Sequence, residues 1–167
     1  ERKGFKYIAK ALNDNKLNKE KFDLMVFGEQ EQINLKFKNR KIIFKKGSFY
    51  GNDIALRTLY SAADLLIAPS ELEAFGQVAS EAGACETPCI AFENTGFEDV
   101  ILHKKTGFLA KYKSHVDLAA GIVWCLNNSK RLSLGKKSRM YIKKKFDSKV
   151  IASKYIELYT ELKRKKL

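Results

Sequence analysis

Histidine, proline and cysteine are scarce in this chain of 167 residues, which contains two, two and three of them. The cysteines Cys85, Cys89 and Cys125 are odd in number and lack the C-x2-C spacing of zinc sites, so they predict neither a disulfide framework nor a structural metal. We interpret them as reduced, mostly buried thiols of a cytoplasmic protein. With only His103 and His115 available, a histidine-rich metal site is also disfavoured, and we expect chemistry without a metal or another cofactor.

Long apolar runs are also missing. The longest stretches, such as residues 65–69, are strand-sized and fall far short of the roughly 20 residues that cross a bilayer. The chain starts at Glu1 without an initiator Met or a signal-peptide pattern, which favours a piece of a longer protein. Its hydrophobic content of 45% suffices for one core, so we expect a single domain over residues 1–167.

Acidic residues are outnumbered, with 19 Asp and Glu against 32 Lys and Arg and a formal net charge of +13. Such a field attracts phosphates of nucleotides, nucleic acids or anionic lipid headgroups alike. The lysines are spread over segments 36–46, 104–113, 130–145 and 163–166, and ordinary solvation of exposed faces explains them equally well. The charge therefore leaves the kind of partner open.

The secondary-structure signals alternate in type along the first two thirds of the chain. Strand-like apolar runs at residues 22–27, 41–44, 64–69 and 88–92 are separated by helical patterns at 5–12, 53–63, 76–85 and 97–102. This order predicts an α/β fold with a Rossmann-like open parallel sheet and helices on both faces. After a turn at Thr106-Gly107 we expect no further strand, and helices over 116–126, 129–146 and 148–166 give a helical C-terminus.

The loop at residues 69–76 connects a predicted buried strand to a helix, which is where ligands bind in open α/β sheets. Gly76 lets a phosphate approach the backbone, and the N–H groups of Gln77 and Val78 favour an anion at the helix N-terminus. Glu73 and Glu81 can face the same ligand and accept hydrogen bonds from sugar hydroxyls. By spacing alone, however, the two glutamates are more typical of ordinary surface acids.

This loop belongs to a series of short motifs in a fixed order. Residues 69–88 contain Pro69-Ser70, Glu73 and Glu81 with seven residues between them, Phe75-Gly76 inside that interval, and Thr87-Pro88. The flanking motifs are residues 59–64, 96–101, 106–109 and, at the N-terminus, Arg2-Lys3-Gly4-Phe5. Together they resemble the retaining GT-B glycosyltransferases of family 4 (glycosyl transferases group 1), especially bacterial enzymes that build cell-surface polysaccharides such as capsule and lipopolysaccharide.

The resemblance implies the nucleotide-sugar-binding domain of such an enzyme and assigns roles to individual residues. Lys3 and Glu73 would be catalytic, because Lys3 neutralises the leaving diphosphate and Glu73 contacts the transferred sugar. Glu81 would hold the ribose hydroxyls. The same resemblance places further donor-binding residues at Phe75, Gly76, Gln77, Val78 and Gly28.

The resemblance also implies partners. The donor would be a UDP- or GDP-hexose, and a glycan or lipid-linked acceptor would bind an N-terminal domain that this sequence lacks, together with the first strand of the sheet. The last helix, residues 148–167, would return toward that missing domain or simply cap this one. We expect a cytoplasmic location with peripheral contact to an anionic membrane, and little turnover by this chain alone.

Two positions depart from the family pattern. Glu86 stands where the family has a glycine suited to a left-handed helix C-cap. Thr95-Gly96 replaces the usual Gly-Gly, which affects a donor-sugar contact but not the architecture.

Two functions of other classes compete with this interpretation. Lysines interleaved with aromatics, as at residues 36–38, would suit a nucleic-acid-binding module, but no helix-turn-helix, RRM or zinc-finger pattern is present. A non-catalytic interaction domain of the same fold would be expected to lack Glu73 or Glu81, and both are present. We therefore expect no nucleic acid partner.

Overall fold

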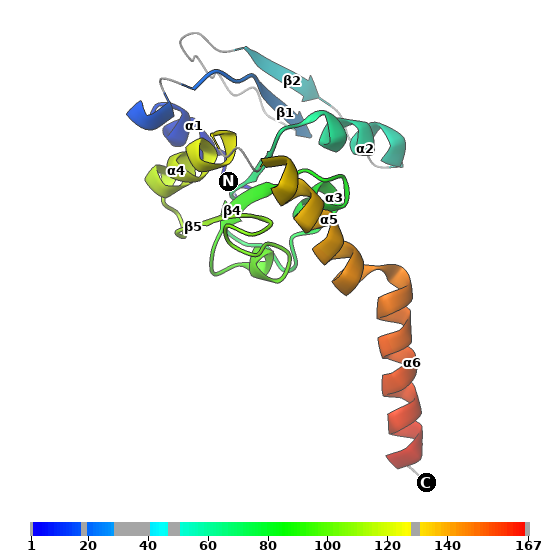
Figure 1. Ribbon diagram of the computed structural model, residues 1–167. Helices are drawn as coiled ribbons and strands as arrows, with labels where there is room; N and C mark the ends of the chain where they lie inside the picture. Colours follow the sequence, from blue (N-terminus) through cyan, green and yellow to red (C-terminus); the bar gives the residue numbers. More distant parts are fainter. Residues whose placement is uncertain (1, 18–19, 29–40, 47–50, 128–130, 166–167) are drawn as a thin grey trace.

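A computed structural model describes residues 2–17, 20–28, 41–46, 51–127 and 131–165, and Figure 1 shows their arrangement. The elements follow one another in the order α1 (Phe5–Leu12), η1 (Asn15–Leu17), β1 (Leu24–Gly28), β2 (Ile42–Lys46), α2 (Asp53–Ala62), β3 (Leu66–Ala68), α3 (Gln77–Ala84), β4 (Cys89–Phe92), η2 (Gly96–Asp99), β5 (Gly107–Ala110), α4 (His115–Leu126), α5 (Arg131–Phe146) and α6 (Ser148–Lys165). Residues 36–38, the basic and aromatic segment considered for nucleic-acid binding, lie outside the described residues.

The described strands form two parallel sheets. β1 pairs with β2, with Leu24 opposite Ile42, and β3, β4 and β5 form a second sheet in that order. Helices separate the strands β2, β3 and β4 along the chain, and helices end it. The predicted α/β class with parallel strands and a helical C-terminus is confirmed.

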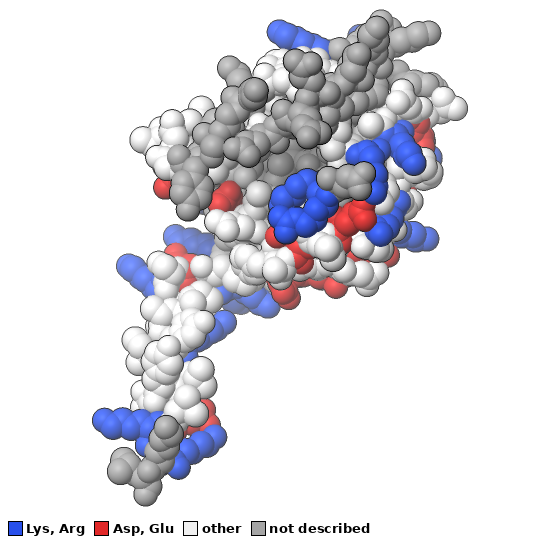
Figure 2. All heavy atoms as spheres, turned by 180° about the vertical axis from the view of Figure 1, so that it is seen from behind, with Lys and Arg blue, Asp and Glu red and all other residues white. Residues whose placement is uncertain are grey.

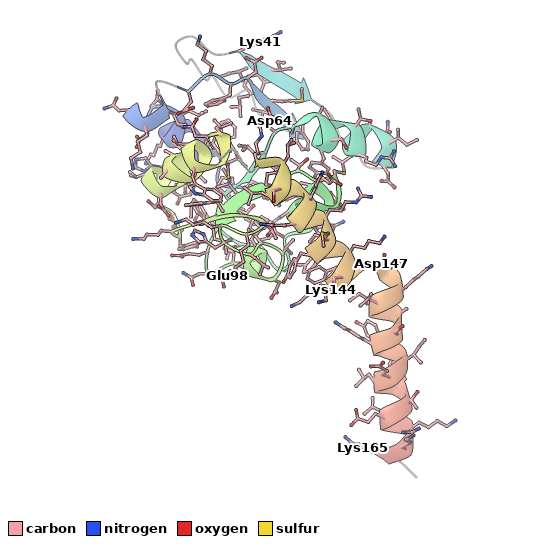
Figure 3. The ribbon with its side chains drawn as sticks, in the orientation of Figure 1. Lys41, Asp64, Glu98, Lys144, Asp147 and Lys165 are labelled. Atoms are coloured by element: carbon pink, nitrogen blue, oxygen red, sulfur yellow. The ribbon has the colours of Figure 1, made fainter. Side chains whose placement is uncertain are left out.

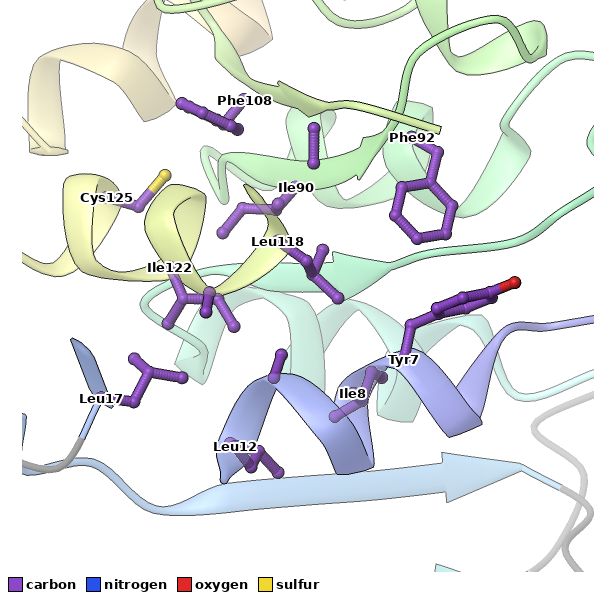
Figure 4. Packing of buried hydrophobic residues seen from close by; sticks show 13 residues of the cluster. Tyr7, Ile8, Leu12, Leu17, Ile90, Phe92, Phe108, Leu118, Ile122 and Cys125 are labelled. Carbon is purple, nitrogen blue, oxygen red and sulfur yellow. The ribbon is translucent and has the colours of Figure 1, made fainter. Parts of the chain in front are cut away.

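The central strand β4 is buried along its whole length and sends alternate side chains to opposite faces. Ile90 and Phe92 belong to a core cluster with residues of α1, β5 and α4, as Figure 4 shows. Within this cluster the ring of Tyr7 in α1 meets Phe92 edge to face, with 5.1 Å between their centroids. Helices α1 and α4 therefore cover one face of the sheet.

The other face of the sheet is covered by α3 and α5. Cys89 and Ala91 of β4 belong to a second core cluster on this face. Its other buried members are Ala79 of α3, Phe97 of η2, Val100, Ile101 and Ile142 of α5. The helices fit closely because α3 and α5 meet at a glycine. A Cβ on Gly83 would lie 2.5 Å from Ser138 Oγ of α5. The predicted coverage of both faces is thus observed.

Helix starts follow the capping chemistry of the sequence. The Asn52 side chain accepts a hydrogen bond from the Ala55 N–H at 3.1 Å, so Asn52 caps α2. Ser114 caps α4 in the same way through the Asp117 N–H, also at 3.1 Å. These caps fix where the loops at the edge of the sheet end.

The prediction that no strand follows residue 106 was wrong, because β5 pairs with β4 over four residues. The strand opens with Gly107, a residue that weakens strand patterns in a sequence. Its reason is close approach: a Cβ on Gly107 would lie 2.2 Å from the carbonyl oxygen of Cys89. Gly107 thus weakens the strand pattern in the sequence, but its lack of a side chain allows β5 to pair closely with β4.

Helix α6 extends away from the rest of the chain (Figure 1). None of its described residues is buried, and its side chains project into solvent between Asp147 and Lys165 (Figure 3). Its exposed apolar residues are Tyr155, Ile156, Leu158, Tyr159 and Leu162. In the part of the chain that the structure describes, no helix is long and apolar enough to traverse a membrane.

Candidate functional site

The N-terminal segment and the loop after β3 are joined through their backbones, although some 65 positions separate them. The N–H of Glu71 donates to the carbonyl oxygen of Arg2 at 2.9 Å. Gly4, the N-cap of α1, has φ 71°, and a Cβ there would lie 1.8 Å from the carbonyl oxygen of Pro69. Only glycine permits this contact, which brings the two predicted motifs, Lys-Gly and Pro-Ser, to one place.

This docking brings Lys3 and Glu73 together. The Lys3 Nζ lies 3.4 Å from Glu73 Oε2, and the side chains are 63% and 18% exposed. The Glu73 carbonyl accepts a hydrogen bond from the Gly96 N–H at 2.8 Å, so η2 holds the loop in place. The two residues predicted to be catalytic therefore share one partly exposed site.

Helix α3 starts beside this pair with an open N-terminus. Its N-cap Gly76 has φ 89° and offers no side chain to cap the helix, which leaves the Gln77 and Val78 N–H groups at its positive end. A Cβ on Gly76 would lie 2.6 Å from Phe97 Cδ1. Glycine is thus required here by backbone conformation and packing, in addition to any close approach of a ligand.

Glu81 lies on α3 with a hydrogen-bond donor at each carboxylate oxygen. Gln77 Nε2 donates to Oε1 at 3.0 Å, and the Tyr60 hydroxyl donates to Oε2 at 3.1 Å. Burial raises the pKa of Tyr60, and the Glu81 charge and hydrogen bond raise it further, so the hydroxyl stays protonated. The carboxylate is therefore held in one orientation.

A third glutamate, Glu71, is the centre of a cluster of charges next to the site. Its carboxylate lies 2.7 Å from Lys6 Nζ and 3.0 Å from Lys113 Nζ, and it accepts a hydrogen bond from the Tyr7 hydroxyl at 3.2 Å. Hydrogen bonds from Lys6 and Lys113 lower the pKa of Glu71 to about 2. Glu71 thereby ties α1 and the loop before α4 to the loop that contains Glu73.

The remaining predicted donor-binding residues lie in different surroundings. Phe75 is partly exposed, and its ring meets Phe146 of α5 edge to face at 5.1 Å. Val78 packs against the core cluster of α3 and α5. Gly28 ends β1 with φ 116°, and none of the described residues has an atom within 4 Å of a Cβ added there.

Sequence reasoning missed Tyr60, Glu71, Lys6 and Lys113. Tyr60 and Glu71 lay within or next to the quoted motifs, but nothing in their spacing indicated a partner. Each depends on contacts between separate elements, such as the hydrogen bond between Tyr7 and Glu71, which are 64 positions apart.

Among the described residues, no group of three or more His, Cys, Asp or Glu is placed to hold a metal ion.

The structure is an α/β domain with parallel strands. An uncapped helix N-terminus, a lysine and carboxylates beside the strand ends are typical of α/β domains that bind phosphorylated ligands. Residues 1–145 match the family model described as Glycosyl transferases group 1. The chain belongs to this family, and its fold is that of GT-B-like glycosyltransferases.

Similar proteins include the N-acetyl-alpha-D-glucosaminyl L-malate synthase of Bacillus anthracis, 31% identical over 117 residues, which are 70% of this chain and 31% of that protein. The capsular polysaccharide biosynthesis glycosyltransferase CapM of Staphylococcus aureus is 29% identical over 61% of this chain and 27% of its own length. The structure of Anabaena HepE in complex with UDP-glucose superposes with a TM-score of 0.77 at 19% identity, over 96% of this chain and 46% of that one. The chain thus spans about a third of the curated relatives it matches.

Proposed function

We propose that this chain is the donor-binding domain of a retaining glycosyltransferase of family 4, which moves a hexose from a nucleotide diphosphate sugar. The observation that carries the proposal is the contact of Lys3 with Glu73 beside the open N-terminus of α3. A cation, free N–H groups and a carboxylate within one partly exposed site match the diphosphate and the hydroxyls of such a donor.

Each group has a separate task in this proposal. Glu81 accepts hydrogen bonds from the ribose hydroxyls, and the Gln77 and Val78 N–H groups bind phosphate at the helix N-terminus. Glu73 accepts hydrogen bonds from the hydroxyls of the transferred sugar. Gly28, at the end of β1, and Phe75 complete the donor site.

The reaction stage that this domain would assist is departure of the nucleoside diphosphate. Cleavage of the sugar–phosphate bond builds negative charge on the leaving oxygen. Lys3 is two residues before α1 and 63% exposed, so its ammonium group can move from Glu73 to the diphosphate. Together with the dipole of α3 it would stabilise the leaving group without a metal ion.

The acceptor side belongs to another part of the enzyme in this proposal. Similarity to a capsular polysaccharide glycosyltransferase supports a bacterial cell-surface polysaccharide as the product, with a glycan or lipid-linked acceptor. An apolar stripe on α6 would pack on an acceptor-binding N-terminal domain. Its residues follow one another at spacings of three and four and are Ile151, Tyr155, Leu158 and Leu162. The free cysteines fit work in the cytoplasm, and the basic side chains would allow peripheral contact with the inner face of the membrane.

The alternative function, binding of a nucleic acid, receives no comparable support. On the face in Figure 2 the basic side chains are scattered over the body and along α6, so the described residues on that face present no single basic groove for a nucleic acid backbone. Oligonucleotide binding stronger than nucleotide-sugar binding would reverse this order.

Calorimetric titration of the chain with UDP, GDP and ADP and with their sugar conjugates tests the proposal. At least one diphosphate should bind, and Glu81→Ala should weaken it by roughly tenfold or more, because it removes hydrogen bonds to a charged group. Glu157→Ala serves as the matched control, since Glu157 is exposed on α6, the helix that extends away from the rest of the chain. Absence of binding, or equal binding by both variants, would refute the assignment.

A further inference from the structure

We propose that Tyr60 is a positioning residue that fixes the Glu81 carboxylate for bidentate recognition of the ribose 2′,3′-diol. This inference rests on the proposed function, because it takes Glu81 as the ribose-binding group. It adds a residue that does not touch the ligand itself and a specificity for ribose over 2′-deoxyribose.

The hydrogen bond from Tyr60 to Glu81 joins α2 to α3 across 21 positions. Tyr60 is only 3% exposed, and its hydroxyl lies 3.1 Å from Glu81 Oε2. A buried hydroxyl needs a partner, and the described structure gives it this one. Burial and the Glu81 charge together keep the hydroxyl protonated, so it remains a donor.

The tyrosine itself has little freedom to move. Its carbonyl oxygen accepts a hydrogen bond from Thr87 Oγ1 at 2.6 Å, and that threonine is buried at the entry to β4. Its ring meets Phe27 at the end of β1 edge to face, with 6.0 Å between centroids. Tyr60 therefore connects the end of β1 and the entry to β4 with Glu81, so contacts from both sheets fix the position of the carboxylate.

The bonds that Glu81 already makes determine what it can still accept. A carboxylate offers about four lone-pair sites on its two oxygens. Among the described residues, Gln77 occupies one site on Oε1 and Tyr60 one on Oε2, which leaves one on each oxygen for a ligand. A vicinal diol presents two adjacent O–H donors and matches this pair, whereas a 2′-deoxyribose satisfies only one oxygen.

Without the Tyr60 hydroxyl, Oε2 would be free to rotate toward solvent, because the remaining bond from Gln77 comes from an exposed side chain on the same helix. The diol would then have to order the carboxylate as it binds. The affinity for the ribonucleotide should fall, while the deoxyribonucleotide, which uses one oxygen only, should lose less.

The test is calorimetric titration of the chain with UDP and 2′-deoxy-UDP, with GDP and 2′-deoxy-GDP in parallel. The wild-type chain should prefer the ribose form by about tenfold, as expected for one hydrogen bond to a charged group. Tyr60→Phe should weaken UDP binding by roughly three- to tenfold and reduce the preference to below about threefold. In a double-mutant cycle it should add little to Glu81→Ala.

Tyr141→Phe is the matched control, because the Tyr141 hydroxyl donates to the Asp99 carbonyl and not to Glu81, and it should retain the ribose preference. Gln77→Leu removes the other bond to Glu81 and should lower the preference even if Tyr60→Phe folds poorly. Ribose preference that survives in both variants overturns the role of Tyr60 but leaves the proposed function intact. Wild-type binding without ribose preference also overturns it, and failure to bind any diphosphate overturns both.

Discussion

Lys3 Nζ lies 3.4 Å from Glu73 Oε2, although the two residues are 70 positions apart in the sequence. Because Lys3 is largely exposed, this ion pair contributes little to folding, and its effect should be seen in ligand binding. Lys3→Met should weaken UDP binding by roughly tenfold or more. It should change uridine binding little, since only UDP carries the diphosphate. Calorimetry at fixed ionic strength measures both. Lys10→Met, an exposed substitution on α1, is the control, and an equal loss for uridine and UDP would contradict the role of Lys3.

Glu73 should contribute to binding of the sugar moiety of the donor and not to binding of the nucleotide. Glu73→Gln keeps the size of the side chain but removes the charge that hydroxyl donors prefer. Compared with the wild-type chain, it should bind UDP with nearly unchanged affinity while its preference for UDP-glucose over UDP declines. Glu98→Gln provides the comparison, because Glu98 accepts a hydrogen bond from the Asn94 N–H in a neighbouring loop. A loss of UDP binding by Glu73→Gln would instead place Glu73 at the phosphates.

Much of the fold could be predicted from the sequence because its signals are local. The span of α1 follows from helical spacing in residues 5–12 and is observed, and the Asn52 cap follows from a side chain three residues before its partner. The division of the strands into two sheets and the strand β5 could not be predicted in this way. Both features depend on contacts between separate segments of the chain, namely the pairing of strands and the close approach of Gly107 to Cys89.

The site was predictable in composition but not in its connections. The resemblance indicated Lys3, Glu73 and Glu81, and the fold brings the first two together. Tyr60, which donates to Glu81, and the cluster around Glu71 depend on contacts between elements whose pairing no motif encodes. Such residues are visible only once the packing of α1 and α2 is known.

The charge cluster at Glu71 predicts a specific dependence of stability on pH. The pKa of this carboxyl is about 2 in the folded chain and 4.5 ordinarily, so its stabilising effect is complete above about pH 4.5 and is lost as the pH falls toward 2. Glu71→Gln should lower the free energy of unfolding at pH 7. The difference from the wild-type chain should diminish through that window and vanish near pH 2.

Thermal or urea unfolding at a series of pH values measures this difference. Glu157→Gln should leave the curve unchanged, since Glu157 is exposed on α6, which extends away from the rest of the chain. A constant difference between Glu71→Gln and the wild-type chain from pH 7 to pH 2 would show that packing, and not charge, accounts for the role of Glu71.

Glu86 occupies a backbone conformation that favours glycine. It follows the C-cap of α3 with φ 64°, as the departure from the family pattern suggested. A left-handed conformation costs a residue other than glycine about 1–2 kcal/mol, while glycine loses about 0.5–1 kcal/mol of chain entropy. Glu86→Gly should therefore stabilise the chain by about 0.5–1 kcal/mol and raise the Tm by about 1–4 °C. Cys85→Gly, at the neighbouring position with φ −89°, should lower the Tm.

The apolar stripe of α6 should not stabilise this chain by itself. Leu158 is 47% exposed and no residue of α6 is buried, so Leu158→Asp should change the free energy of unfolding by less than about 0.5 kcal/mol. Leu118→Ala in α4 is the contrasting substitution, because Leu118 is fully buried and its truncation should cost about 2–5 kcal/mol. In a longer protein that includes the proposed acceptor domain, Leu158→Asp should destabilise the protein and lower turnover, since a charge would enter the domain contact. A large loss already in the isolated chain would mean that α6 packs on this domain or on a second copy, and it would remove the reason to assign the stripe to an acceptor domain.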